Sequence, residues 1–290
     1  MTSTSGSSQG AAPGRPAAAR RGPARAARPL LVLAFWLLVW QAVAWAVGQE
    51  FLLASPVSVA RRLAELVVTG EFWGTVGHSL ARIAVGFLAA VVVGVATAAA
   101  SAASRIVDTT LGPAMTAVRA APVVSFIILL LMLPGGAGRL AATTAFLMVL
   151  PIVHATVLEG IRQRDRGLLE MAAVFRVPWR RRLVAVDVPA VLPYLAAACH
   201  VGVGLAWKAG VAAEVIGMPQ GSIGERMYQA KLLLLSADLF AWTVVVIAVS
   251  FASERLVAAL LARGQARLAV GRRGPAGDAG PAAEAREAAA

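Results

Sequence analysis

Charged residues are scarce in this sequence of 290 residues: Asp, Glu, Lys and Arg make up 14% of it, where a soluble globular chain has about 25%. Apolar residues make up 59%, and the mean hydropathy is +0.73. Because so little polar surface is available to face water, we expect a lipid bilayer to surround the chain. With one cysteine, Cys199, and three histidines, a disulfide framework and a Cys/His metal site are excluded.

Motifs of nucleotide-binding and hydrolytic proteins are also missing. The sequence contains no G-x-x-x-x-G-K-[ST], no H-E-x-x-H and no G-x-S-x-G run, so P-loop nucleotide binding and two common kinds of hydrolase are excluded. We therefore expect a chain that is not an enzyme and holds no cofactor. A membrane-embedded enzyme is the least favoured alternative, and any energy source must belong to another subunit.

Long uncharged runs are what the sequence has in abundance. A helix needs about 20 residues to cross the hydrocarbon core. We therefore predict an all-α, polytopic membrane protein with about six transmembrane helices, of which the first is a retained anchor and the last is the shortest. The predicted runs are Leu30–Val47, Ile83–Ser104, Ala120–Gly138, Leu140–Leu158, Val188–Trp207 and Leu239–Ser253. The prolines at 113, 122 and 134 are expected to kink or break the third run.

Both ends of the chain differ in composition from the middle. Residues 1–28 are mostly Ser, Gly, Ala, Pro and Arg, and the C-terminal stretch is similar. Such segments bury too little apolar surface to offset the entropy of ordering. We predict a disordered basic tail over 1–28, a transmembrane domain over 29–265 and a disordered tail over 266–290.

The basic excess, with 27 Lys+Arg against 15 Asp+Glu and a formal charge of +12, has two possible meanings. In a soluble domain it would suggest nucleic acid, but in a membrane chain basic residues mark the cytoplasmic loops. The arginines cluster before the first run, between the fourth and fifth, and after the sixth. We therefore predict cytoplasmic termini, a cytoplasmic 160–190 loop and no nucleic-acid partner.

That loop has the pattern of two short helices. Leu168–Val177 carries an apolar helical face of Leu168, Leu169, Ala172, Ala173 and Phe175. Pro178 interrupts this helix and is tolerated at the start of a second one over Trp179–Val188. The loop either lies on anionic lipid with its arginines snorkelling or contacts a protein partner.

Several residues now carry a resemblance to a family. The run Glu170-Met-Ala172-Ala-Val-Phe-Arg176, followed by Val188-Pro189, resembles the EAA loop of ABC-importer permeases. Further matches, similar to the nitrate, taurine and alkanesulfonate branch, are Ser55-Pro56, Ser79-Leu-Ala-Arg82 before Gly86-Phe87, Arg119-Ala-Ala-Pro122, Glu214 and Gly221-Ser-Ile-Gly224. Two departures stand out. Met171 replaces the first Ala of the motif and Arg176 replaces its Gly, so no glycine hinge is expected after the first helix.

The resemblance implies the fold of a type I ABC-importer permease in a bacterial plasma membrane. Its implied partners are an ATPase subunit that binds ATP and magnesium, an extracytoplasmic substrate-binding protein and a second permease copy in a homodimer. The loop would dock on the ATPase through Glu170, Met171, Ala172, Ala173, Arg176, Pro178 and Pro189. Glu170 would be the charged contact, the two alanines would permit close approach, and Arg176 would either make a contact or face water. The implied substrate is a small solute such as a sulfonate, taurine, nitrate or a thiamine-precursor-like pyrimidine.

Three charged residues near membrane depth are candidates for the translocation pathway: Arg119, Lys208 and Glu214. Lys208 and Glu214 are six residues apart, about 240° around a helix, so each needs its own partner. The alternative is that these two snorkel to the outer interface. An ion-driven secondary transporter is the competing function. It predicts paired ionisable residues at the midplane and an internal repeat, and the sequence has no convincing repeat.

Overall fold

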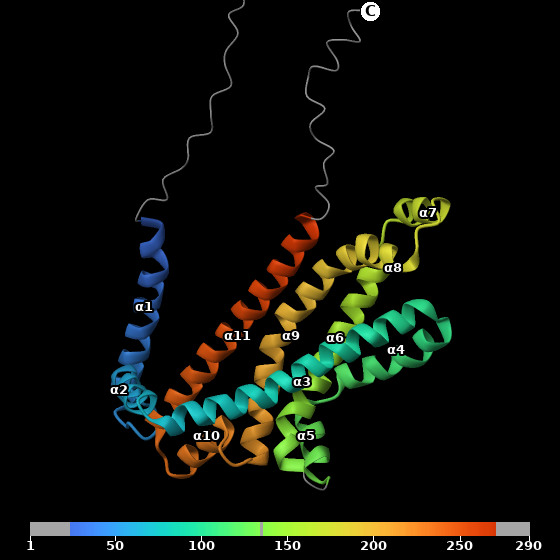
Figure 1. Cartoon of the computed structure of the whole chain (residues 1–290). Coiled ribbons are helices and arrows are strands. Elements are labelled where there is room, and N and C mark those ends of the chain that lie inside the picture. The colour runs from blue at the N-terminus through green and yellow to red at the C-terminus, as the bar shows by residue number, and fades with distance from the viewer. Residues whose placement is uncertain (1–23, 134–135, 271–290) are drawn as a thin grey trace, which may run out of the picture.

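The computed structural model describes residues 24–133 and 136–270, and every regular element within these ranges is a helix (Figure 1). The all-α prediction is therefore confirmed. In chain order the helices are α1 (Ala24–Val47), α2 (Pro56–Val67), α3 (Gly70–Ala103), α4 (Arg105–Ala120), α5 (Val123–Leu131), α6 (Gly136–Arg162), α7 (Arg166–Val174), α8 (Trp179–Arg182), the π-helical turn η1 (Leu183–Asp187), α9 (Val188–Gly217), α10 (Ile223–Leu232) and α11 (Ser236–Val270).

Within the described part of the chain, four helical runs are long and apolar enough to cross a membrane. They are Gly70–Ala103, Gly136–Arg162, Trp179–Gly217 and Ser236–Ala266. Each overlaps one predicted run, and even the shortest prediction, Leu239–Ser253, lies inside a 35-residue helix. The first predicted run forms a shorter apolar helix over Leu31–Val47.

The predicted run Ala120–Gly138 is the one that does not form a single straight span. Helix α4 ends at Ala120, α5 begins at Val123, and the two helices are bent by 96°. Pro122 explains the break, because proline disfavours the α conformation in the preceding residue, and Ala121 is extended with ψ 140°. Pro113, by contrast, lies inside α4 without ending it, and residue 134 lies outside the described residues.

Helix continues further toward both ends than predicted. Helix α1 begins at Ala24 and α11 ends at Val270. The predicted tails, 1–28 and 266–290, therefore each include a few residues that are helical. The remainder of both predicted tails lies outside the described residues.

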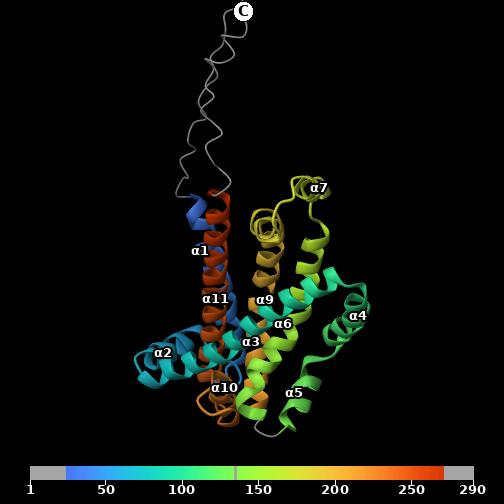
Figure 2. The same ribbon diagram turned by 45° about the vertical axis from the view of Figure 1, so that its right-hand side comes forward.

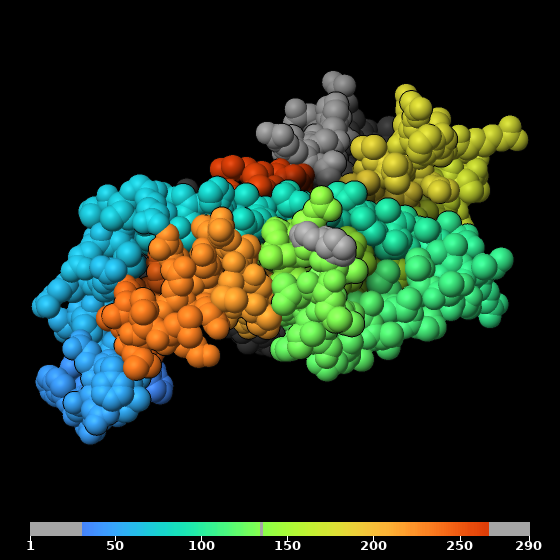
Figure 3. Space-filling view, turned by 90° about the horizontal axis from the view of Figure 1, so that it is seen from below, coloured from blue at the N-terminus to red at the C-terminus, as the bar shows by residue number. Residues whose placement is uncertain are grey.

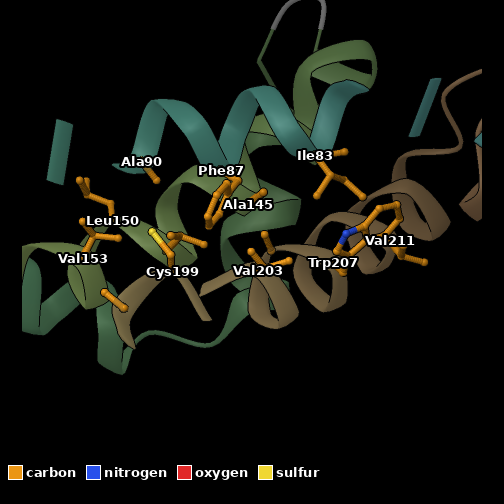
Figure 4. Packing of buried hydrophobic residues seen from close by; sticks show 14 of the residues in the cluster. Ile83, Phe87, Ala90, Ala145, Leu150, Val153, Cys199, Val203, Trp207 and Val211 are labelled. Atoms are coloured by element: carbon orange, nitrogen blue, oxygen red, sulfur yellow. The ribbon is translucent and has the colours of Figure 1, made fainter. Parts of the chain in front are cut away.

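The core lies where α3, α6 and α9 cross (Figure 4). Its buried side chains include Ile83, Phe87 and Ala90 from α3, Ala145, Leu150 and Val153 from α6, and Cys199, Val203, Trp207 and Val211 from α9. Glycines allow these helices to approach closely, as is common where packing in lipid relies on small residues. A Cβ at Gly86 would lie 2.1 Å from the carbonyl oxygen of Ala142, and one at Gly210 would lie 2.6 Å from Cγ1 of Ile83.

The two ends of the molecule carry different elements. Helix α7 lies at one end, together with the start of α1 and the end of α11, in both side views (Figures 1 and 2). The opposite end is formed by α2, α10 and α5, with α10 lying between the other two (Figure 3). The loop that resembles the EAA loop, the start of α1 and the end of α11 are therefore at the same end of the molecule.

Candidate functional site

Helix α7 is defined by a cap at each end. The carboxylate of Asp165 accepts hydrogen bonds from the backbone N–H groups of Gly167 at 2.8 Å and Leu168 at 3.4 Å, which satisfies donors that the first helical turn leaves free. At the other end, Val177 N–H bonds to the carbonyl of Ala172 at 2.9 Å, and Arg176 N–H bonds to that of Ala173 at 3.1 Å. These two bonds form a Schellman motif, so the first predicted helix of the loop is confirmed.

Arg176 occupies the position in this motif that glycine usually takes. Its φ of +49° is left-handed, a conformation that costs a residue with a Cβ about 1–2 kcal/mol. As expected from the sequence, the chain has no glycine hinge at this position, but it turns here all the same. The turn forms with arginine in a strained conformation, and the Arg176 side chain is exposed.

The apolar residues of α7 divide into an inner and an outer set. Ala172 is buried in its own chain at 7% exposure. The resemblance implied that this alanine would permit close approach of the ATPase, but the side chain is covered by the permease itself. Four large side chains point outward instead: Leu168, Met171, Val174 and Phe175 are between 37% and 78% exposed. Glu170 and Ala173 are exposed beside them. The single apolar face predicted for this helix is thus two faces, of which the outer one is unpartnered within the described residues. We call the exposed side chains of Leu168, Glu170, Met171, Val174 and Phe175 the α7 outer face.

The second helix of the loop is continuous with the long helix that follows. Pro178 precedes α8 with φ −54° and ψ 139°, as predicted for a proline at a helix start. The helix then widens into η1 and runs on as α9, with Pro189 in the first turn of α9. Proline in a helix removes an N–H and crowds the carbonyl four residues earlier, and η1 spans that carbonyl. The two short helices of the prediction are therefore one short helix and the extension of a transmembrane one.

A buried polar cluster lies toward the opposite end of α9. Glu214 is fully buried, and its Oε2 accepts hydrogen bonds from Ser79 Oγ at 2.7 Å and from Gly224 N–H at 3.3 Å. Ser79 Oγ in turn accepts from Ile223 N–H at 2.9 Å. Residues from α3 and α9 thus cap the first turn of α10, where helical N–H groups lack partners in their own helix. Snorkelling is therefore wrong for Glu214.

Arg82 completes this cluster. Its Nη1 lies 3.9 Å from Glu214 Oε1, and Nη2 donates to the carbonyl of Gln220 at 3.4 Å. A Cβ at Gly224 would come within 2.4 Å of Glu214 Cβ and of the backbone nitrogen of Val215, so only glycine permits this approach of α10 to α9. Sequence reasoning named Ser79, Arg82, Glu214 and Gly224 as separate matches and did not bring them together.

The other two pathway candidates are not part of this cluster. Lys208 is exposed on α9, which agrees with the prediction that it cannot share a face with Glu214. Arg119 is exposed in the last turn of α4, immediately before the break at Pro122. A role for either residue in a pathway stays a prediction.

Comparison with known proteins decides the family. Residues 86–267, more than half of the chain, match the family of binding-protein-dependent transport system inner membrane components. The chain belongs to this family. It is 27% identical over 221 residues to the aliphatic sulfonates transport permease protein SsuC of Bacillus subtilis, covering 74% of this chain and 78% of SsuC.

Two further relatives are also permease proteins. The permease is 30% identical over 199 residues to the nitrate import permease protein NrtB of Synechocystis, covering 65% of this chain and 71% of NrtB. It is 26% identical over 189 residues to the bicarbonate transport system permease protein CmpB of Synechococcus elongatus, covering 65% and 68%.

Family membership settles several predictions. The chain is a multi-pass inner-membrane permease component of an ABC importer, and it is a non-catalytic membrane subunit. Binding-protein-dependent transport implies an ATPase and a substrate-binding protein as partners. The family assignment therefore favours an ATP-driven importer over the competing hypothesis of an ion-driven transporter.

Proposed function

We propose that this permease couples to its ATPase through the α7 outer face. The observation that carries the proposal is this exposed apolar face with Glu170 beside it, at the end of the molecule where α6 and α9 meet. An exposed apolar patch with a polar rim is typical of a protein contact. ATP-driven closure of the ATPase pair would press on α7 and reorient α6 and α9 as rigid bodies, which is the movement that alternating access requires.

The proposed complex contains two copies of this permease, two ATPase subunits and an extracytoplasmic binding protein. The homodimer is what the resemblance implies, with one pore-forming half supplied by each copy. ATP and magnesium would be bound by the ATPase, and the end that carries α7 would face the cytoplasm, as its arginines suggest. Crosslinking of single-cysteine variants in the native membrane tests the pairing, which requires crosslinks between two copies of this chain.

We propose a small solute with a compact anionic group as the substrate. The three relatives are named for aliphatic sulfonates, nitrate and bicarbonate, which share a single negative charge and a compact oxygen-rich group. Taurine carries the same sulfonate group. The test is uptake of nitrate, bicarbonate, taurine and methanesulfonate by the complete importer in proteoliposomes. Uptake that depends on ATP and on the binding protein for any of the four supports the proposal, and uptake of none of them contradicts it.

The docking role has a direct test in co-purification of the ATPase with the tagged permease. Glu170→Arg reverses the charge at the outer face, and Phe175→Ser removes its largest apolar side chain. We expect each to reduce the recovered ATPase at least fivefold. Glu50→Arg and Phe51→Ser make the same changes at exposed positions near the opposite end and should leave recovery unchanged. Full recovery with both α7 variants would exclude this face as the docking site.

A further inference from the structure

Asp187 is a buried carboxylate at the base of the loop that carries α7. It is 8% exposed, and within residues 31–133 and 136–266 the only other buried carboxylate is Glu214. Its Oδ1 pairs with Nη1 of Arg164, and its Oδ2 lies 3.4 Å from Nε of Arg182. Arg164 is held further by a bond from its Nε to the carbonyl of Ile161 at 2.7 Å. One buried acid therefore joins two arginines from different parts of the loop.

The positions of these three residues close the loop at its base. Arg164 lies in the link between α6 and α7, next to the Asp165 that caps α7. Arg182 ends α8, and Asp187 ends η1. Just beyond this base, α6 and α9 are in close contact, because a Cβ at Gly160 would lie 2.7 Å from the ring of Tyr194. The base of the loop is thus fixed to both long helices.

The π-helical turn contributes to this arrangement. Residues five apart in an α-helix point about 140° away from each other, which would direct Arg182 and Asp187 to different faces. In η1 the N–H of Val188 bonds to the carbonyl of Leu183, five residues earlier. Such a wider turn brings residues five apart nearer to one face, and single π-turns are frequent at functional sites.

The burial of its carboxylate distinguishes this set from the ion pair Arg162–Asp108 at the same end of the molecule, although Arg164 and Arg182 are themselves 25% and 47% exposed. The pair Arg162–Asp108, at 2.8 Å, is 51% and 32% exposed at its two side chains, and exposed pairs contribute little. The Asp187 side chain is 10% exposed. Removing the partners of a buried charge leaves it without compensation, so Asp187 is favoured to keep its arginine partners, above all the less exposed Arg164, when α7 is pushed.

We propose that Asp187 is a positioning residue of the coupling mechanism. With Arg164 and Arg182 it holds the two ends of the loop together, so that α7, α6 and α9 move as one unit. The inference rests on the proposed function, in which α7 receives force from the ATPase. Without these ion pairs, α7 moves relative to the transmembrane helices, and less solute is transported for each ATP hydrolysed.

The first test measures rigidity in the complete complex. Spin labels are placed at Arg166→Cys on α7 and Val201→Cys on α9, both exposed positions, in a Cys199→Ala background. The distance distribution between the labels is measured with and without a non-hydrolysable ATP analogue. Labelled permease is diluted with an excess of unlabelled Cys199→Ala permease, so that the measured distance is the one within a single copy. We expect one narrow distribution with the native Asp187 and a clearly broader one with Asp187→Asn. Asp108→Asn, which removes the exposed pair at the same end, should keep the narrow distribution.

The second test measures coupling in proteoliposomes, as nitrate or taurine taken up per ATP hydrolysed. Asp187→Asn should lower this ratio at least threefold while the ATPase still co-purifies. Exchange of the charges, Asp187→Arg with Arg164→Asp, should restore part of it. If Asp187→Asn does not fold, Arg182→Gln keeps the Arg164 pair and should give a smaller loss. A narrow distribution and a native ratio in these variants would overturn the inference, whereas failure of the ATPase to co-purify with the unmodified chain would overturn the proposed function instead.

Discussion

At the scale of single residues, Arg176 is the clearest case of a side chain in an unfavourable backbone conformation. Its left-handed φ of +49° ends α7, and two other non-glycine residues, Met218 and Leu234, take the same conformation after α9 and α10. Helices often end this way, usually on glycine. In the loop that carries α7 the consequence is a helix end less stable than a glycine would make it.

Replacing Arg176 by glycine should therefore stabilise the end of α7 by about 1 kcal/mol, because glycine has no Cβ to crowd the carbonyl in the left-handed region. The measurement is hydrogen exchange of the Val177 amide, which bonds to Ala172. Arg176→Ala keeps a Cβ and removes the charge, so it should exchange like the native chain. Equal slowing in both variants would show that the charge, and not the backbone strain, limits stability.

Ser79 supports a second residue-scale prediction, since its hydroxyl joins Glu214 to the first turn of α10. Ser79→Ala leaves a buried carboxylate and a buried N–H short of a partner, at a cost of about 1–3 kcal/mol. We expect a lower midpoint of thermal unfolding in detergent, by about 2–4 °C for each kcal/mol lost.

The matched control for this change is Ser253→Ala in α11. That hydroxyl bonds only to the carbonyl of Val249, one turn earlier in its own helix, at 2.8 Å. Its loss should leave the midpoint nearly unchanged. Similar shifts in both variants would mean that the buried polar cluster contributes no more than an ordinary helical serine.

At the scale of elements, the crossing of α3 and α6 depends on a missing side chain. A Cβ at Gly86 would lie 2.1 Å from a backbone oxygen of α6, whereas one at Gly77 on the same helix would meet nothing within 4 Å. Because a backbone atom cannot rotate away, Gly86→Ala must push the helices apart, and packing in the core is lost. We expect little monodisperse protein in gel filtration after detergent extraction, while Gly77→Ala behaves like the native chain. Normal folding of Gly86→Ala would show that α3 and α6 can separate at low cost.

Sequence patterns predicted most elements because hydropathy and proline act locally. The runs that became α3, α6, α9 and α11 are defined by length and lack of charge, and lipid requires helices there. What local patterns did not predict was geometry between elements. The 96° bend at Pro122 depends on how α4 and α5 pack. The continuity of α8 with α9 depends on a π-turn, and a proline such as Pro189 alone does not distinguish such a turn from a helix break.

The candidate sites show the same division. The helix of the EAA-like loop followed from periodicity and Pro178, but the inward position of Ala172 depends on how the loop packs on its own chain. The polar cluster depends on contacts between residues far apart in sequence, Ser79 and Glu214. A charge buried in an apolar run was the only local signal of it, because such a charge requires a partner.

At the scale of the whole molecule, orientation in the membrane is the property on which the coupling proposal depends. The start of α1, the end of α11 and α7 lie at one end of the molecule, and α2, α10 and α5 at the other (Figure 1). Basic residues collect on the cytoplasmic side of membrane proteins. We therefore predict that residue 170 faces the cytoplasm and residue 50 the exterior.

The single native cysteine makes this prediction simple to check, because Cys199 is 3% exposed and contributes little background labelling. Glu50→Cys and Arg263→Cys are introduced separately and treated in intact cells with a membrane-impermeant maleimide. The Glu50→Cys variant should react at once, and the Arg263→Cys variant, substituted near the end of α11, only after permeabilisation. Because Glu170 lies at the same end as Arg263, the reverse pattern would place α7 outside the cell, where no ATPase subunit can reach it, and the coupling mechanism would be excluded.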